Sequence, residues 1–221
     1  MQRRGFLRAV AGVAAAGALV LPGAAVAASP APVAPAGVQA AEAQPAGVQP
    51  AGAKSLNIQY QVQETGYWCG PAAARIAMSA RTGNLPSQGD LAAQMGTTEN
   101  GTDHISQIAN ALNANLGTTW YEVKEMPNDP PTQAQKDLLW QDIVTDIDNG
   151  YAVVANIVAP PDNHPPGYPN ETIYHYFTVI GYNSDNMTVH IADSANFGGN
   201  QIYWLSFDQL ASLIPPKGYA A

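Results

Sequence analysis

Apolar residues recur at two different spacings along the chain, and each spacing predicts a different kind of element. Within residues 133–149, Leu139, Ile143 and Ile147 stand four positions apart, which is the spacing of one face of an amphipathic helix. The run from Tyr151 to Ala159 is almost continuously apolar, as in a strand that is buried on both faces. We therefore predict a helix over 133–149, ended by Gly150, and then a buried strand.

The same patterns, read together with the turn residues between them, predict the other elements. Further helices are predicted at Pro71–Ala80, at Asp90–Met95, at Asp103–Leu116 and from Phe207 onward. Further strands are predicted at Ile58–Gln63, Thr118–Val123, Tyr174–Tyr182, Met187–Asp193 and Gln201–Leu205. Most helices precede most strands, so the pattern predicts a segregated α+β fold rather than alternating βαβ units.

The first 54 residues differ in composition from the rest of the chain. Arg3, Arg4 and Arg8 precede an uncharged run over 9–21, and Ala25-Val26-Ala27 follows it. This is the order of a secretory signal, and the arginine pair resembles a twin-arginine export signal. We expect residues 1–27 to be a signal peptide.

Residues 28–54 are rich in Ala and Pro and contain no aromatic residue. Such a segment buries too little apolar surface to offset its ordering entropy, which predicts a flexible linker. A removable pro-segment is the alternative. The folded domain is then expected over residues 55–221.

Charge narrows the classes of function. The 221 residues include 9 Lys+Arg against 17 Asp+Glu, a formal net charge of −8. Such a chain has no basic surface for nucleic acid or for an anionic membrane. Beyond the N-terminal segment it has no apolar run long enough to span a bilayer. We therefore expect a secreted bacterial protein without stable membrane insertion after signal cleavage, and a monomer.

The single cysteine, Cys69, excludes a disulfide framework and a Cys-rich zinc site. Pro71 follows at once and predicts that Cys69 lies at a helix N-terminus, where free N–H groups and the helix dipole favour a thiolate. Gly70 is expected to let a substrate backbone approach. Gln63 lies six residues earlier, and its amide with the Cys69 N–H could supply two donors to an oxyanion. The alternative is a small buried hydrophobic residue.

A thiolate nucleophile needs a base, and His175 is the best placed of the histidines. It begins the apolar strand 174–182 and is therefore held rigidly near the end of that strand. Asp193 ends the following strand and could orient the imidazole, with Asn196 as the alternative. The other histidines are expected outside the site: His104, His164 and His190. Their spacing matches no metal-ligand motif, so no metal or other cofactor is expected.

The register between these two strands decides whether the base meets its carboxylate. One register pairs Val179 with Val189, closes with a three-residue loop, and places His175 opposite Asp193. The competing register, with a two-residue turn, sets Val179 against His190. Only the first gives one fully apolar face, and a half-buried sheet fixes its register by that face. We therefore predict the first.

The segment from Gln63 to Ala73, with Cys69 followed by Gly and Pro, resembles the bacteriocin-processing-peptidase-like cysteine peptidases of the papain-like superfamily. The resemblance includes the His175 strand and Asp193 and spans most of residues 58–210. It implies a papain-like α+β fold in which the Cys helix packs on a C-terminal antiparallel sheet. It also implies thiol hydrolysis of amide bonds with these roles: oxyanion donor Gln63, nucleophile Cys69, base His175 and orienter Asp193.

The best-known members of that family cleave after a double glycine and are fused to ABC transporters, whereas this chain has neither transporter spans nor a Walker-type loop. Three functions stay open on the sequence alone. The first is a secreted thiol hydrolase acting on peptides or on cell-envelope amides. The second is a catalytically idle domain that binds peptides or wall polymers. The third is acyl transfer, such as transglutamination.

Overall fold

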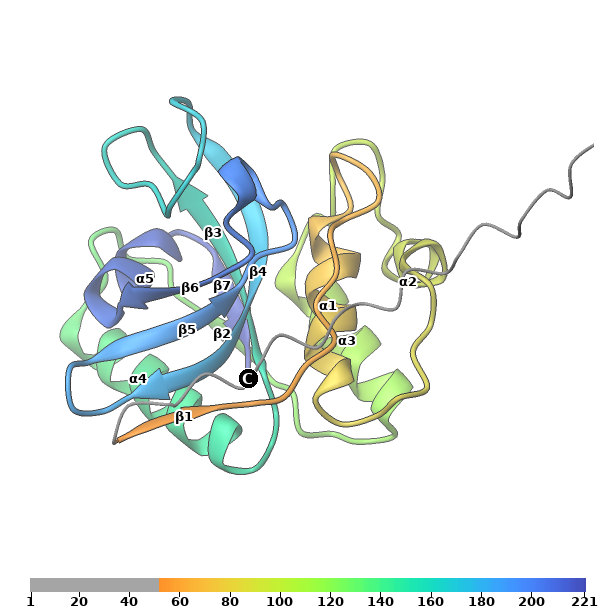
Figure 1. The fold of residues 1–221 in the computed structure, drawn as a ribbon, viewed down its shortest axis with the longest axis horizontal. Helices are drawn as coiled ribbons and strands as arrows, with labels where there is room; N and C mark the ends of the chain where they lie inside the picture. Colours follow the sequence, from red (N-terminus) through yellow and green to blue (C-terminus); the bar gives the residue numbers. More distant parts are fainter. Residues whose placement is uncertain (1–51) are drawn as a thin grey trace, which may run out of the picture. The chain divides into compact units, whose positions relative to one another are not determined.

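A computed structural model describes residues 52–221. These residues form one antiparallel sheet of seven strands, in the order β2-β7-β3-β4-β5-β6, with β1 paired to β4 outside that order (Figure 1). The strands are β1 Ala53–Ser55, β2 Val123–Glu125, β3 Val153–Ala159, β4 Ile173–Asn183, β5 Thr188–Ala192, β6 Ile202–Ser206 and β7 Gly218–Ala220. The expected signal peptide, residues 1–27, and all but the end of the expected linker, 28–54, lie outside the described residues.

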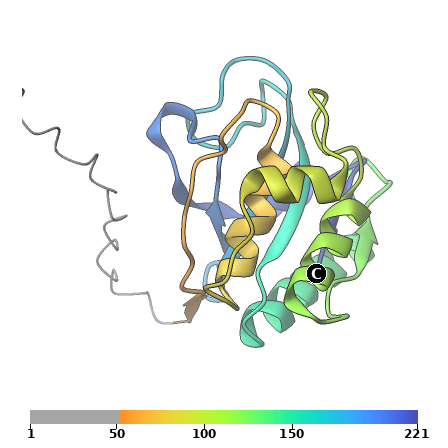
Figure 2. The same cartoon turned by 90° about the vertical axis from the view of Figure 1, so that its right-hand side faces the viewer.

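Helices cover both faces of the sheet. On one face lie α1 Cys69–Ser79, α2 Gln88–Met95 and α3 Ile105–Leu116, which Figure 2 shows from their outer side. On the other face lie α4 Gln133–Asp148 and α5 Phe207–Leu213. A short 3-10 turn, Phe197–Gly199, separates β5 from β6. The predicted α+β class, with the Cys helix packed on an antiparallel sheet, is confirmed.

Local sequence signals explain where several of these helices begin and end. Ser87 with Asp90 and Thr132 with Gln135 form capping boxes that satisfy the first free N–H groups of α2 and α4. Gly96 ends α2 in the left-handed conformation, which glycine adopts without strain. Similar signals lie at both ends of α3 and at the start of α5. The predicted helix ends agree with the observed ones to within about two residues.

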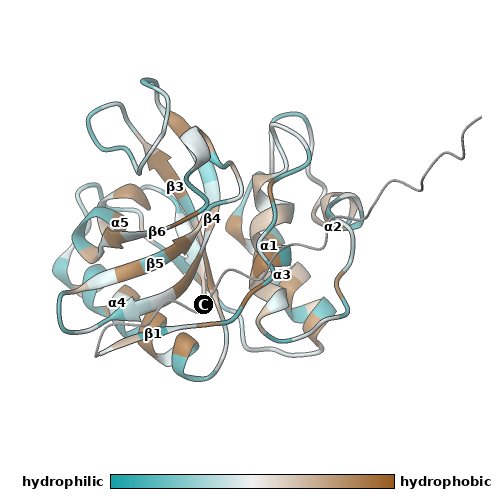
Figure 3. Ribbon diagram, in the orientation of Figure 1, coloured by the Kyte–Doolittle hydropathy of each residue, from teal (hydrophilic) through white to brown (hydrophobic). Residues whose placement is uncertain are grey.

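The core is divided into two clusters by the sheet. Successive side chains of a strand point to opposite faces, so Val154 packs beneath α1–α3, whereas Val153 and Ala155 pack beneath α4 and α5. Figure 3 shows brown, hydrophobic segments on β3 and β5, and both strands contribute residues to each cluster. The α4 residues predicted as its apolar face, Leu139, Ile143 and Ile147, are fully buried in the second cluster.

Two predicted strands are wrong. Residues 58–63 are extended but join no ladder, and the strand in this region is β1, which starts at Ala53 inside the expected linker. Residues 118–122 are irregular, and β2 begins only at Val123. The pattern also missed β7, because its three residues follow two prolines and are too few to show a period. Edge and terminal strands depend on partners that are distant in sequence.

The predicted register of β4 and β5 is also wrong. Val179 pairs with Ile191, a bulge at Ile180 shifts the ladder, and Tyr182 then pairs with Val189. The connecting loop has four residues and carries Met187 at φ 51. The prediction assumed that one face of the sheet is solvated. Since both faces are buried, the apolar pattern did not distinguish the registers.

Candidate active site

Cys69 is the first residue of α1 and lies where that helix meets the sheet. The helix starts two residues earlier than predicted, and its N-cap residue, Trp68, makes no side-chain capping bond. The thiol therefore lies beside free backbone N–H groups at the positive end of the helix. It is 8% exposed and lines a pocket of about 200 Å³. The sulfur is thus both shielded and reachable.

Small residues bring α1 close to the sheet. Ala72, Ala73 and Ala74 are almost fully buried, and the main-chain carbonyl of Ala73 accepts a hydrogen bond of 2.9 Å from the Thr178 hydroxyl of β4. This bond ties the Cys helix directly to the strand that carries His175. The helix position and the strand position are therefore fixed relative to each other.

Gly70 has a different role from the one expected. A Cβ at this position would lie 2.3 Å from the Thr102 hydroxyl and 2.9 Å from the Thr102 Cβ. The missing side chain therefore makes room for the turn between α2 and α3, not for a substrate backbone. This turn forms one wall of the pocket at Cys69.

His175 and Asp193 are joined even though the predicted register is wrong. Imidazole Nε2 and carboxylate Oδ1 lie 2.9 Å apart, and both side chains are at most 4% exposed. Asp193 follows the end of β5 and reaches His175 through its side chain rather than as a directly paired neighbour. Because Nε2 is engaged, Nδ1 is the nitrogen left for the thiol. Cys69 and His175 line the same pocket, and His175 lies close enough to lower the pKa of the thiol.

The electrostatics of the three side chains favour charge separation. Burial by itself would raise the pKa of Cys69, but the hydrogen bond and positive charge of His175, with the Tyr176 and Gly70 amides, lower it overall. Burial would lower the pKa of His175, whereas Asp193 and the thiolate raise it overall. Burial would raise the pKa of Asp193, but His175 and two tyrosines lower it. The arrangement favours a thiolate, an imidazolium and a carboxylate.

Gln63 is held by the residue that follows Asp193. Its backbone N–H donates to the Ser194 carbonyl at 2.9 Å, and its side-chain oxygen accepts from the Ser194 hydroxyl at 3.3 Å. Its amide nitrogen donates to the Thr65 carbonyl at 2.9 Å, which uses one of its two hydrogens. Gln63 does not line the pocket at Cys69, so the structure places it beside Ser194 and leaves one amide hydrogen uncommitted.

The pocket includes residues that were not among the predicted site residues. Its walls come from the turn before α3, from β3 and β4, and from the chain before β7. They are Asn100, Gly101, Thr102, Asp103, Asn156, Tyr174, Tyr176 and Lys217. Asn156 was detectable, because it is the one polar residue in an otherwise apolar strand; its amide donates to the Tyr176 hydroxyl at 2.9 Å.

The other histidines lie outside this site. His104 caps α3 and is half exposed. The His164 ring bonds the Glu171 carbonyl at 2.9 Å. His190 lies 2.8 Å from the Ser55 hydroxyl and stacks on Trp204, and burial lowers its pKa to about 4. These placements agree with the predictions for all three.

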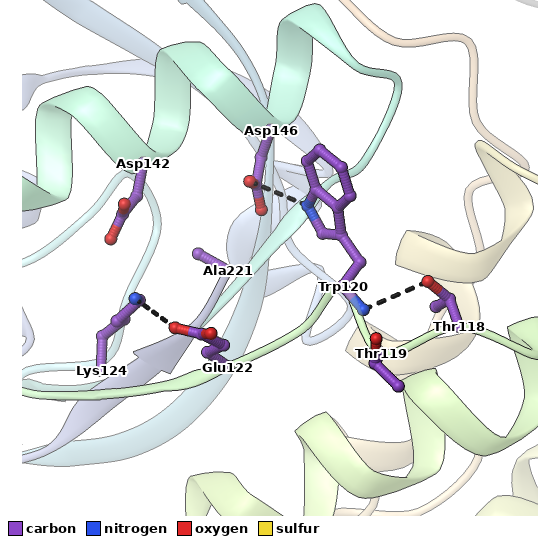
Figure 4. Close-up of a pocket in the computed structure, with 8 residues that line it drawn as sticks. All are labelled: Thr118, Thr119, Trp120, Glu122, Lys124, Asp142, Asp146 and Ala221. Atoms are coloured by element: carbon purple, nitrogen blue, oxygen red, sulfur yellow. Dashed lines mark hydrogen bonds and ion pairs between the residues drawn. The ribbon is translucent and has the colours of Figure 1, made fainter.

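A larger pocket, of about 390 Å³, shares no residue with the one at Cys69. Figure 4 shows Asp142 and Asp146 of α4 pointing toward it, with Trp120 donating to Asp146 and Lys124 paired with Glu122. Asp146 is 4% exposed, and its Oδ2 has no partner among the described residues. That oxygen is also closed to solvent.

Two further observations concern residues 52–221 alone. In that part of the chain, no helix is long and apolar enough to cross a membrane. The same residues contain no cluster of three or more His, Cys, Asp or Glu side chains that could hold a metal ion.

An α+β domain that sets a helix-terminal thiol against the imidazole of a sheet residue has the arrangement of a cysteine peptidase. Residues 55–212 match the Peptidase_C39 like family, and the chain belongs to that family. This finding confirms the resemblance that the Cys69 segment and the His175 strand predicted, and it makes the chain a cysteine peptidase by family. No curated protein matches the sequence.

Solved structures resemble the chain at low identity. The peptidase domain of Streptococcus ComA, a bi-functional ABC transporter involved in quorum sensing, is 16% identical, with 75% of this chain and 98% of that one covered and a TM-score of 0.49. A double glycine motif protease from an AMS/PCAT transporter, solved with a leader peptide, is 10% identical (75% and 91% covered, TM-score 0.46). Xylellain, a cysteine protease from Xylella fastidiosa, is 12% identical (76% and 85% covered, TM-score 0.46).

Proposed function

We propose that this protein is a secreted thiol hydrolase that cleaves peptide or other amide bonds, with Cys69 as nucleophile, His175 as base and Asp193 as orienting carboxylate. The observation that carries the proposal is the position of His175. Its ring bonds Asp193 at 2.9 Å, and it lines the same pocket as the Cys69 thiol, whose pKa it lowers. Nucleophile, base and orienter are related in this way in thiol hydrolases.

The reaction follows from the protonation states. The Cys69 thiolate attacks the substrate carbonyl carbon, and a tetrahedral oxyanion forms. When the C–N bond breaks, His175 gives its proton to the leaving amine and a thioester is left on Cys69. Neutral His175 then takes a proton from water, whose oxygen attacks the thioester and releases the acid and the thiolate. Asp193 holds the ring in place throughout and stays ionised.

Gln63 is the proposed side-chain donor to the oxyanion. Its amide retains one uncommitted hydrogen, and its hydrogen bonds to Ser194 and Thr65 fix its orientation. The Cys69 N–H, at the helix start, is the proposed second donor. The proposed role of Gln63 is supported by the family resemblance and by the restrained orientation of its amide.

Export is proposed from the N-terminal sequence. The Arg3-Arg4 pair, the uncharged run and Ala25-Val26-Ala27 have the order of an export signal. A peptidase exported in this way would meet extracellular peptides or the amide bonds of the cell envelope, which are the proposed substrates.

The test uses protein recovered from the medium of producing cells, so that it also tests export. A thiol-directed activity probe is expected to label wild type, to miss Cys69→Ala completely, and to label His175→Ala weakly at neutral pH. Peptide-library digestion then gives the cleaved sequences. Correctly folded wild type that is never labelled would contradict the thiol assignment, and labelling without turnover would favour the idle binding domain.

A further inference from the structure

The Asp193 carboxylate is surrounded by hydrogen-bond donors. Its Oδ1 accepts from His175 Nε2 at 2.9 Å and from the Ala195 N–H at 3.0 Å. Its Oδ2 accepts from the phenols of Tyr168 at 2.8 Å and Tyr203 at 2.6 Å. An ionised carboxylate has about four lone-pair sites, so this one is filled. The residue is fully buried, and its only described ionised partner is His175.

The two phenols reach the carboxylate from separate parts of the fold. Tyr168 comes from the loop between β3 and β4, and Tyr203 comes from β6. The Tyr168 ring also lies edge-on to the His175 ring, with centroids 6.2 Å apart. Both phenols therefore converge on the far side of the carboxylate from the base, and one of them packs on the base as well.

We propose that Tyr168 and Tyr203 are positioning residues that hold Asp193 ionised and turn its Oδ1 toward His175. The inference rests on the proposed function of Cys69 and His175, because the tyrosines act only through them. A phenol that donates to a carboxylate favours its charged form, since the neutral acid accepts more weakly. Removal of one phenol leaves the buried Oδ2 with one donor instead of two, and the carboxylate then takes up a proton at a higher pH.

Among the described residues, few titratable side chains face Asp193, so the effect of losing one phenol on the pH dependence of the thiolate can be measured. They are His175 from β4, Tyr168 from the loop, Tyr203 from β6 and Tyr60 from the segment before α1. Once Asp193 is protonated, the buried imidazolium loses its counter-charge and the Cys69 thiolate loses its partner. Loss of a phenol should therefore raise the pH below which the thiolate disappears.

The experiment measures the rate of iodoacetamide alkylation of Cys69 against pH in wild type, Tyr168→Phe, Tyr203→Phe and the double variant. The acid inflection is expected to move up by about one to two pH units for each phenol lost. The rate at neutral pH should change little. Circular dichroism at each pH confirms that the variants are folded, and the single variants decide the matter if the double variant does not fold.

Tyr60→Phe is the matched control. Its phenol donates to the main-chain carbonyl of Asp193 at 2.8 Å, not to the carboxylate, so the inflection should stay at the wild-type pH. If Tyr168→Phe and Tyr203→Phe lose thermal stability but keep the wild-type inflection, the inference is overturned and the proposed function stands. If wild type itself alkylates only around pH 8–9, like free cysteine, the proposed function fails first.

Discussion

At the scale of single residues, the reactivity of Cys69 depends on whether charge or burial dominates. Desolvation of a buried thiol favours the neutral form, but an imidazolium and two backbone amides at the sulfur favour the anion, so the pKa falls. The lowered pKa favours the thiolate over the thiol, and the thiolate is lost when the pH falls through that pKa. The charge of the Cys69 thiolate depends on the positive charge of His175, which depends in turn on the Asp193 carboxylate.

Gln63 gives the prediction at this scale. Gln63→Ala is expected to reduce kcat by roughly 10²–10³ and to leave KM nearly unchanged, because it removes one of the two proposed oxyanion donors. The measurement is steady-state kinetics on a peptide substrate found in the library digestion. Gln59→Ala, an exposed glutamine on the same extended segment, is the control and should behave like wild type. Equal turnover in both variants would contradict the oxyanion role.

At the scale of elements, β4 organises the site because three partners share its length. Its first half pairs with β3, its last three residues pair with β1, and its other edge pairs with β5. The bulge at Ile180 lies where β3 gives way to β1. Beyond the bulge the side chains change face, which turns Tyr182 toward α4 and the second cluster.

Gly181 is the residue that lets β4 change its pairing partner from β3 to β1. A Cβ there would lie 2.4 Å from the Lys54 carbonyl and from the Ser55 hydroxyl of β1. Gly181→Ala is therefore expected to lower the free energy of unfolding by about 1–3 kcal/mol, because backbone must move. Urea denaturation checks this. Gly83→Ala, with nothing within 4 Å of its Cβ, should change stability by less than about 0.5 kcal/mol.

At the scale of the whole molecule, Asp146 predicts how stability depends on pH. Burial, partly offset by the Trp120 hydrogen bond, raises its pKa to about 7. The folded state thus binds a proton more tightly than the unfolded state, where the pKa is about 3.9. The contribution of Asp146 to the free energy of unfolding is fully present below about pH 4 and is lost as the pH rises through 7.

Asp146→Asn is therefore expected to raise the free energy of unfolding at pH 8 by a few kcal/mol, with an upper bound of about 4 kcal/mol. At pH 4 it should give no gain, since the wild-type carboxyl is then neutral in the folded state. Thermal and urea unfolding at both pH values check this. Asp137→Asn, exposed on the same helix, should show no such pH-dependent gain. A gain of the same size at both pH values would contradict the buried-charge explanation.

The sequence alone determined the parts that depend on neighbouring residues. Capping residues and a period of about four determine α2, α3 and α4, and the Cys69-Gly70-Pro71 string places the thiol at a helix start. The segregation of helices and strands determines the α+β class, and the motifs led to the family. These signals are short in range, so no knowledge of distant contacts is needed to interpret them.

Tertiary structure decided what depends on distant partners. The register of β4 and β5 escaped prediction because both faces are buried, and the bulge and loop that fix it leave no periodic signal. The sequence predicted Asp193 as the partner of His175, but the hydrogen bond between them forms in a register of β4 and β5 that differs from the predicted one. Tyr168 and Tyr203 lie 25 and 10 residues from Asp193 in sequence, and only the folded sheet and its covering loop bring their phenols to one carboxylate.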